Sequence, residues 1–173
     1  MAAQYKVAEN MIDTMAAMSA ANNAQLDCRA EQMADFSDKW SHDGLVMDKW
    51  FMLQGTNPAA DALENVRQTM NHPTFSLKNP NRTRSLVAGF SANNPVHFHA
   101  KDGSGYAFLT EILTILNTSN PQVAARLIEP LLKLRQYDAN RQQLMREQLE
   151  KLAAMDNLAK DLFEKVQKTL VQK

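Results

Sequence analysis

The fold follows from stretches such as residues 120–134, which read NPQVAARLIEPLLKL. Apolar side chains recur in it every three or four residues, which is the spacing of one face of an α-helix. These apolar positions are Val123, Leu127, Leu131 and Leu134. Asn120 is a good N-cap, and Pro121 fits the first helical position because the amide that proline lacks would be unpaired there. The stretch therefore predicts a helix over residues 121–135 with one buried face.

The same helical spacing covers most of the chain, and no window alternates over enough residues to predict a strand. It recurs within residues 7–18, 59–70, 106–116, 145–155 and 158–170. The 173 residues include only 5 glycines and 6 prolines, the residues that most often interrupt helices. We therefore predict an all-α fold of about eight or nine short antiparallel helices, arranged as a helix-pair solenoid or as an irregular bundle.

Turn-forming residues predict where several helices begin and end. Asn57, which precedes a proline, is expected to begin a helix over residues 59–70. Gly44 is expected to end a helix over residues 28–42, and a short helix over residues 45–54 is expected to follow it. Ser104, in a glycine-rich turn, is expected to cap the helix that follows it.

Pro130 lies inside the predicted helix over residues 121–135 and is expected to kink it, because proline cannot donate a hydrogen bond to the carbonyl of Arg126. Gln122 lies one turn before Arg126 on the same side of that helix. A kinked helix end that presents glutamine and arginine together fits a carboxylate or peptide carbonyls. Surface ion pairing of Arg126 is the alternative interpretation.

A second cationic spot is predicted at Arg82 and Arg84. Both follow Asn79-Pro80-Asn81, a turn that begins a helix by the same Asn-Pro logic. Ion pairing at the surface is again the alternative to ligand binding.

Composition argues against several classes of partner. Lys and Arg number 19, Asp and Glu number 19, and no basic cluster stands out, so nucleic acid is not a predicted partner. No stretch approaches the ~20 apolar residues that span a bilayer, so no membrane is predicted either. Cys28 is the single cysteine and cannot form an internal disulfide, which favours a reducing, cytoplasmic location.

The sequence offers no convergent catalytic set. His97 and His99 are two residues apart and would share a face only in an extended segment, so loop or cap roles are favoured over metal ligation. Cys28 has no histidine partner in the sequence pattern and is interpreted as structural. We therefore predict no catalytic residue, no metal site and no cofactor in this chain.

Four longer motifs carry a family resemblance that runs from Gln4 to the C-terminus. They are Asp48-Lys49-Trp50-Phe51, Asn79-Pro80-Asn81-Arg82-Thr83-Arg84-Ser85-Leu86, Asp102-Gly103-Ser104-Gly105-Tyr106 and Asn120-Pro121-Gln122-Val123-Ala124. Together they resemble the C-terminal helical domain of the bacterial aminopeptidase N family, alanyl aminopeptidases among the gluzincin zinc metallopeptidases. The resemblance implies a HEAT/armadillo-like superhelical array. In it, residues 3–173 are the C-terminal half of the helical domain, and residues 1–2 are an added start.

The resemblance also implies a role for this domain. In the family it caps the active-site cavity of an enzyme that removes N-terminal residues from peptides, gates access and helps bind the distal end of the peptide. By the same resemblance, Arg84, Gln122 and Arg126 line that cavity, and the kink at Pro130 supports the site. The zinc and the catalytic residues belong to another domain of the parent chain, so this chain alone is expected to be inactive.

The implied partners are therefore the catalytic domain of the same parent chain and peptide substrates. A free-standing helical-repeat scaffold for protein–protein interaction is the alternative, because a solenoid of helix pairs also presents an extended binding surface.

Overall fold

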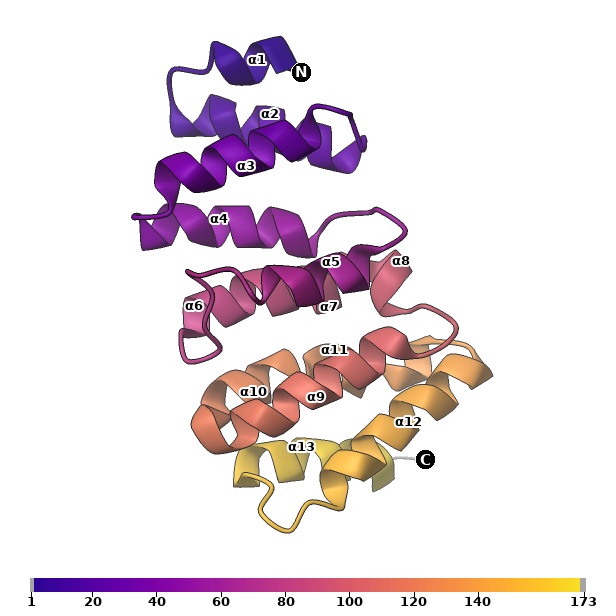
Figure 1. Cartoon of the computed structure of the whole chain (residues 1–173). Helices are drawn as coiled ribbons and strands as arrows, with labels where there is room; N and C mark the ends of the chain where they lie inside the picture. The colour runs from indigo at the N-terminus through magenta and orange to yellow at the C-terminus, as the bar shows by residue number, and fades with distance from the viewer. Residues whose placement is uncertain (1, 172–173) are drawn as a thin grey trace.

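The chain folds into helices that are stacked in layers from one end of the molecule to the other (Figure 1). The computed structural model describes residues 2–171, and within this range it contains helices and turns but no strand. The predicted all-α fold is therefore confirmed. The first elements are α1 (Ala2–Lys6), α2 (Met11–Asn23), α3 (Arg29–Trp40), α4 (Gly44–Gly55), α5 (Ala62–Thr69), α6 (Pro80–Thr83) and the π-helical turn η1 (Arg84–Ala88). They are followed by α7 (Gly89–Asn93), α8 (Pro95–Phe98), α9 (Ser104–Ser119), α10 (Pro121–Leu127), α11 (Glu129–Leu132), the 3₁₀ turn η2 (Leu134–Gln136), α12 (Ala139–Ala153) and α13 (Lys160–Val171).

The number of helices also agrees with the prediction. In the described part of the chain, eight α-helices have seven or more residues. In addition, α6, η1 and α7 follow one another without a break and form one helical segment over residues 80–93. The prediction of eight or nine short helices is therefore confirmed.

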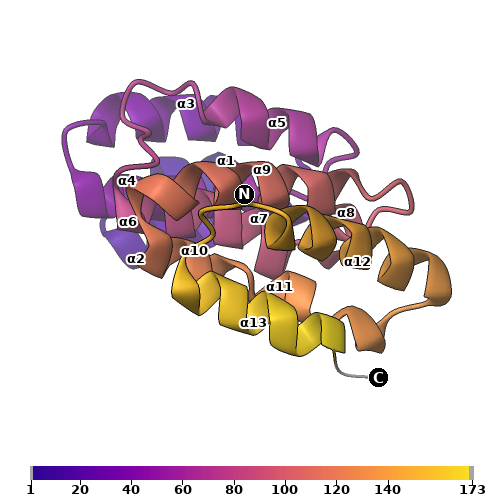
Figure 2. The same cartoon turned by 90° about the horizontal axis from the view of Figure 1, so that it is seen from below.

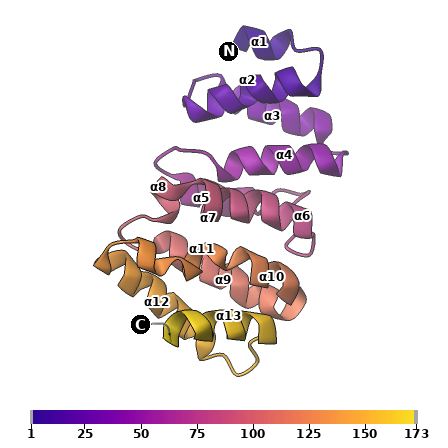
Figure 3. The ribbon, with the colours of Figure 1, turned by 180° about the vertical axis from the view of Figure 1, so that it is seen from behind.

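The layers have two sides. The helices α3, α5, α9 and α12 lie on the near side in Figure 1, whereas α2, α10 and α13 lie on the near side in Figure 3. Helix α4 packs against α3 toward one end of the array and against η1 and α7 toward the other. Seen from below, α13 runs alongside α10 and α11 (Figure 2). Since α10 also contacts η1, these elements of neighbouring layers meet.

The close approach of α4 to η1 depends on a glycine. A Cβ atom at Gly55 would lie 2.5 Å from the backbone oxygen of Leu86 and 2.9 Å from the backbone nitrogen of Phe90. Only a residue without a side chain fits between these backbones. Phe51 and Phe90 are fully buried beside this crossing and belong to the core. The crossing therefore sets where η1 lies relative to the layers on either side.

One expected helix boundary is wrong because of a cap that precedes Gly44. Gly44 begins α4 instead of ending α3. The side-chain carboxylate of Asp43 accepts hydrogen bonds from the N–H groups of Leu45 (3.0 Å) and Val46 (3.1 Å). The helix thus starts where its free N–H groups find an acceptor.

Two other expected boundaries are wrong for a similar reason. The side-chain oxygen of Asn57 accepts a hydrogen bond from the N–H of Ala59 (3.2 Å), which stabilises a turn ahead of α5 and does not begin the helix. Ser104 is the first residue of α9 and not its cap. Its N–H donates to the carboxylate of Asp102 (3.0 Å), and Gly103 makes the turn with a φ of 73°. In both places the residue that was expected to cap the helix makes its hydrogen bond within a local turn instead.

Candidate functional site

Arg84 is the first residue of η1, and the turn before it holds its side chain. Asn79 caps the segment by accepting hydrogen bonds from the N–H groups of Asn81 (3.0 Å) and Arg82 (3.3 Å). The guanidinium of Arg84 donates from Nε to the carbonyl of Pro80 (3.3 Å) and from Nη2 to Oδ1 of Asn81 (2.6 Å). Arg84 is exposed. Local hydrogen bonds therefore orient a cation that still faces solvent.

Gln122 and Arg126 lie one turn apart on α10, and both are exposed. Asn120 begins α10 as predicted, because its Oδ1 accepts a hydrogen bond from the N–H of Val123 (3.3 Å). Within residues 2–171, neither the Gln122 nor the Arg126 side chain makes a hydrogen bond or an ion pair. Both polar groups are therefore available to a ligand.

Arg84 and Arg126 line the same hollow, which has a volume of about 430 Å³ and lies between η1, α4 and α10. The remaining lining residues are Asp48, Met52, Asn81, Ser85, Ala88 and Leu127. Met52, Ala88 and Leu127 are apolar, and Asp48 contributes a carboxylate. The fold thus brings together two arginines that belong to different layers. We call this space the two-arginine hollow.

Arg126 also lines a second hollow, of about 530 Å³, between α10 and α13. Its other lining residues are Gln122, Ala125, Asp161, Glu164 and Lys165. We call this space the mixed-charge hollow. Arg126 therefore stands at the boundary between two hollows, whereas Arg84 and Gln122 line different ones.

The helix expected over residues 121–135 is divided near Pro130 into α10, α11 and η2. Proline has no N–H to donate to the carbonyl of Arg126, and its ring disturbs the turn before it. In that turn the carbonyl of Ala125 accepts a hydrogen bond from Nζ of Lys165 (2.6 Å). The same ammonium pairs with the carboxylate of Glu129. Because Lys165 belongs to α13, the interruption also attaches α13 to α10.

Arg82 is not the exposed cation that the sequence pattern predicted. Its side chain is only 7 % exposed and forms an ion pair with the carboxylate of Asp48. It also donates from Nε to the carbonyl of Thr74 (3.0 Å) and from Nη1 to the carbonyl of Gly44 (2.6 Å). Its guanidinium lies over the ring of Phe51, 5.2 Å from the centroid. Arg82 therefore ties three segments together and neutralises the carboxylate that borders the two-arginine hollow.

Sequence reasoning missed a chain of hydrogen bonds around His99. Nδ1 of His99 lies 2.9 Å from the hydroxyl of Tyr106, and Nε2 lies 2.8 Å from the hydroxyl of Tyr137. The neutral ring donates to one tyrosine and accepts from the other. Burial, with the charge of Arg141 as a second cause, lowers the pKa of His99, and burial raises the pKa of Tyr106 to about 12. His97 instead contacts the carbonyl of Pro58 (3.0 Å), so the two histidines do not share a site.

The described residues do not fit a metal centre. Among residues 2–171, no group of three or more His, Cys, Asp or Glu side chains is placed to hold a metal ion. The family zinc implied by the sequence resemblance thus has no candidate ligand set in this part of the chain. In the same range, none of the helices combines the length and the apolar character needed to cross a membrane.

Comparisons with known proteins relate this fold to a larger protein. A family model described as "Domain of unknown function (DUF3458_C) ARM repeats" matches residues 1–171. Aminopeptidase N of Escherichia coli (strain K12) is 56 % identical over 167 residues, which cover 96 % of this chain and 19 % of that protein. Aminopeptidase N of Haemophilus influenzae is 56 % identical over 166 residues, with the same coverage of 96 % and 19 %.

Among solved structures, Legionella pneumophila aminopeptidase A in complex with aspartic acid matches with a TM-score of 0.89 and 29 % identity. The match covers 97 % of this chain and 20 % of that one. The chain thus spans about a fifth of the length of the relatives it matches. It belongs to the DUF3458_C ARM-repeat family and corresponds to the C-terminal ARM-repeat domain of bacterial aminopeptidase N.

Proposed function

We propose that this chain is the helical module that caps the active-site cavity of a zinc aminopeptidase, gates access to it and binds the distal end of the peptide. The observation that carries the proposal is the meeting of Arg84 and Arg126 in one hollow. Residues 3–173 then form the C-terminal half of the helical domain of the parent chain. Its catalytic domain and its peptide substrates are the partners, and the single cysteine favours a cytoplasmic location.

The chemistry of the two-arginine hollow suits a peptide C-terminus. An arginine presents several N–H donors in a planar fork that matches a carboxylate. Arg126 has this fork free among the described residues, and Arg84 adds a second positive charge. Arg82 already neutralises the carboxylate of Asp48, so Asp48 repels an incoming anion less than a free carboxylate would.

The proposal gives this chain a role in peptide binding and the catalytic domain the role in bond cleavage. Arg84, Gln122 and Arg126 bind and orient the far end of the peptide. The helix break at Pro130 supports Arg126, since it brings α13 against α10 through Lys165. Because the described residues make no metal site, the proposal assigns bond cleavage and zinc to the parent's catalytic domain.

Replacing Arg126 in the parent enzyme tests this proposal. We expect Arg126→Ala to lower kcat/KM about tenfold for peptides of three or more residues, because a charge-assisted hydrogen bond contributes about 1.5–3 kcal/mol. A minimal aminoacyl anilide has no distal carboxylate and should be hydrolysed at nearly the wild-type rate. Arg135→Ala is the matched control, because Arg135 is exposed and lines neither hollow. Equal losses for peptide and anilide would contradict the proposed role.

The alternative of a free-standing scaffold makes a different prediction about the gene. An open reading frame that continues upstream into an H-E-x-x-H motif supports the aminopeptidase module. A stop codon directly upstream would support the scaffold. The coverage of only 19 % of the matched aminopeptidases favours the first outcome.

A further inference from the structure

Two carboxylate side chains line the mixed-charge hollow, although a site for a peptide carboxylate requires only positive or neutral donors. Asp161 and Glu164 lie one turn apart on α13, and both are exposed. They line the hollow together with Gln122 and Arg126 of α10. A peptide carboxylate held by Arg126 on this side would therefore share the hollow with two negative charges. These two carboxylates are not used by the proposed function.

The other cation in this hollow is already occupied. Lys165 pairs with Glu129 and donates to the carbonyl of Ala125 (2.6 Å), so its charge is taken by α10 and α11. Glu164 has one loose partner, the ammonium of Lys160, at 3.8 Å with both side chains mostly exposed. Such exposed pairs are weak and easily exchanged. The charges that remain for a ligand are thus one positive, on Arg126, and two negative.

We propose that Asp161 and Glu164 make the site select peptides whose C-terminal residue has a basic side chain. The main-chain carboxylate is held by Arg126, and the side-chain ammonium or guanidinium reaches the two carboxylates of α13. This inference rests on the proposed function, since it assumes that a peptide C-terminus binds at Arg126. It adds the class of peptide that binds there.

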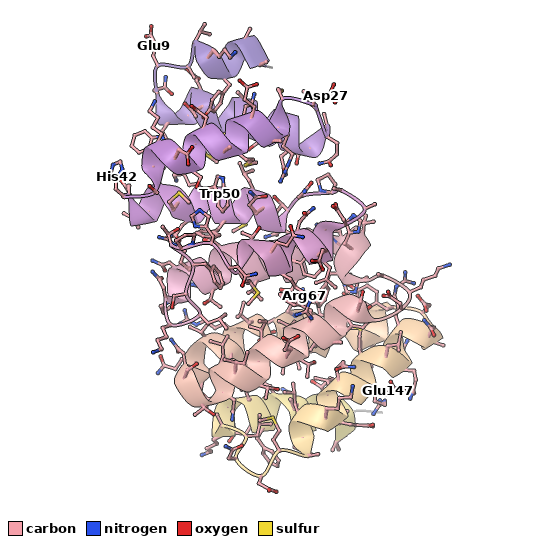
Figure 4. The ribbon with its side chains drawn as sticks, viewed as in Figure 1. Glu9, Asp27, His42, Trp50, Arg67 and Glu147 are labelled. Carbon is pink, nitrogen blue, oxygen red and sulfur yellow. The ribbon has the colours of Figure 1, made fainter. Side chains whose placement is uncertain are left out.

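Asp161 has a second role that the test must separate. It lies in the first turn of α13, where a carboxylate also stabilises the helix through the helix dipole. Glu164 lies further along the helix and is the cleaner position to change. Glu147→Gln is the matched control, because Glu147 lies on α12 (Figure 4), is exposed and does not line the hollow.

The experiment measures binding of acetylated tripeptides to the 173-residue chain by calorimetry or NMR titration at low salt. Acetylation removes the peptide's own ammonium, which could otherwise occupy the carboxylates. We expect acetyl-Ala-Ala-Lys to bind about two- to fivefold more tightly than acetyl-Ala-Ala-Ala, and acetyl-Ala-Ala-Glu to bind most weakly. Glu164→Gln should reduce this preference, and the double variant Asp161→Asn, Glu164→Gln should abolish it. Glu147→Gln should leave the preference for the basic peptide unchanged. Tm measurements should show that all variants are folded.

Two kinds of result would overturn the inference, and they are distinguishable. If binding is lost on C-terminal amidation but does not depend on the last side chain, the carboxylate site stands and the basic preference is wrong. Tightest binding by acetyl-Ala-Ala-Glu, or a preference that survives in the double variant, would also show that the basic preference is wrong. If amidation has no effect, or if no peptide binds at millimolar concentration, the proposed function fails and this inference fails with it.

Discussion

His99 is the residue whose environment departs most from what its neighbours in the sequence suggest. Both of its ring nitrogens are engaged by tyrosine hydroxyls, and its ring stacks on Tyr137 with 4.1 Å between centroids. Arg141 also donates from Nε to the backbone carbonyl of His99 (2.7 Å). The cluster joins the start of α9 to the start of α12. Burial disfavours the charged ring, and the positive charge of Arg141 disfavours it further, so the folded state favours the neutral form.

This environment predicts how stability depends on pH. The lowered pKa means that the unfolded chain binds a proton more readily than the folded chain, so protonation favours unfolding. The contribution of His99 is present above its unfolded pKa of about 6.5 and is lost as the pH falls through that value toward the folded pKa. We expect the free energy of unfolding in urea to fall between pH 7.5 and 5.5, and His99→Gln to weaken this dependence. His42→Gln is the control, because His42 is exposed; a pH dependence unchanged by His99→Gln would contradict the prediction.

At the scale of elements, the crossing of α4 over η1 shows how packing overrides local preference. Gly55 is the last residue of α4, and glycine is among the poorest helix formers. It is nevertheless required there, because the backbone of η1 lies where a Cβ would be. The same crossing positions Arg84 at the start of η1. Gly44, at the other end of α4, has only the far end of the Arg82 side chain near its Cβ position, at 3.4 Å.

The two glycines of α4 therefore respond oppositely to the same substitution. We expect Gly55→Ala to destabilise the chain by about 2–3 kcal/mol, because backbone atoms at 2.5 Å and 2.9 Å must move apart. Gly44→Ala should be nearly neutral or slightly stabilising, because its contact is of ordinary length and alanine favours helix. Urea unfolding of both variants measures the difference. Equal effects at the two positions would show that the crossing is looser than described.

At the scale of the whole molecule, cations and carboxylates of neighbouring layers line two hollows that share Arg126. Arg84 comes from η1, Arg126 from α10 and Glu164 from α13. No single layer contains the two-arginine hollow or the mixed-charge hollow. Each hollow exists only because successive layers pack together.

We therefore expect the 173-residue chain to bind peptides without cleaving them. We expect the purified 173-residue chain to contain no stoichiometric zinc by elemental analysis and to leave an aminoacyl anilide unhydrolysed. The reason is that the described residues hold no group of three or more side chains suited to a metal. One zinc per chain together with anilide hydrolysis would contradict this expectation. Activity restored by adding the catalytic domain of the parent would be consistent with it.

Short-range chemistry explains which features could be predicted from sequence. Helical spacing and the cap at Asn120 depend on residues three or four apart, so they are visible without a fold. Helix starts at Gly44 and Ser104 were misplaced because several adjacent polar groups compete to cap the same turn. The sequence pattern identifies Arg82 and Arg84 as candidate cations but does not distinguish them, because burial of Arg82 against Asp48 depends on contacts between distant segments.

The helical class and the interruption near Pro130 can be predicted without a fold, because they depend on local periodicity and on a missing N–H. Only the tertiary structure decided that Arg82 is buried against Asp48 while Arg126 stays free among residues 2–171. It also decided that Arg126 joins two hollows. The physical reason is that burial and charge pairing are set by contacts between layers, and these contacts join residues that are far apart along the chain.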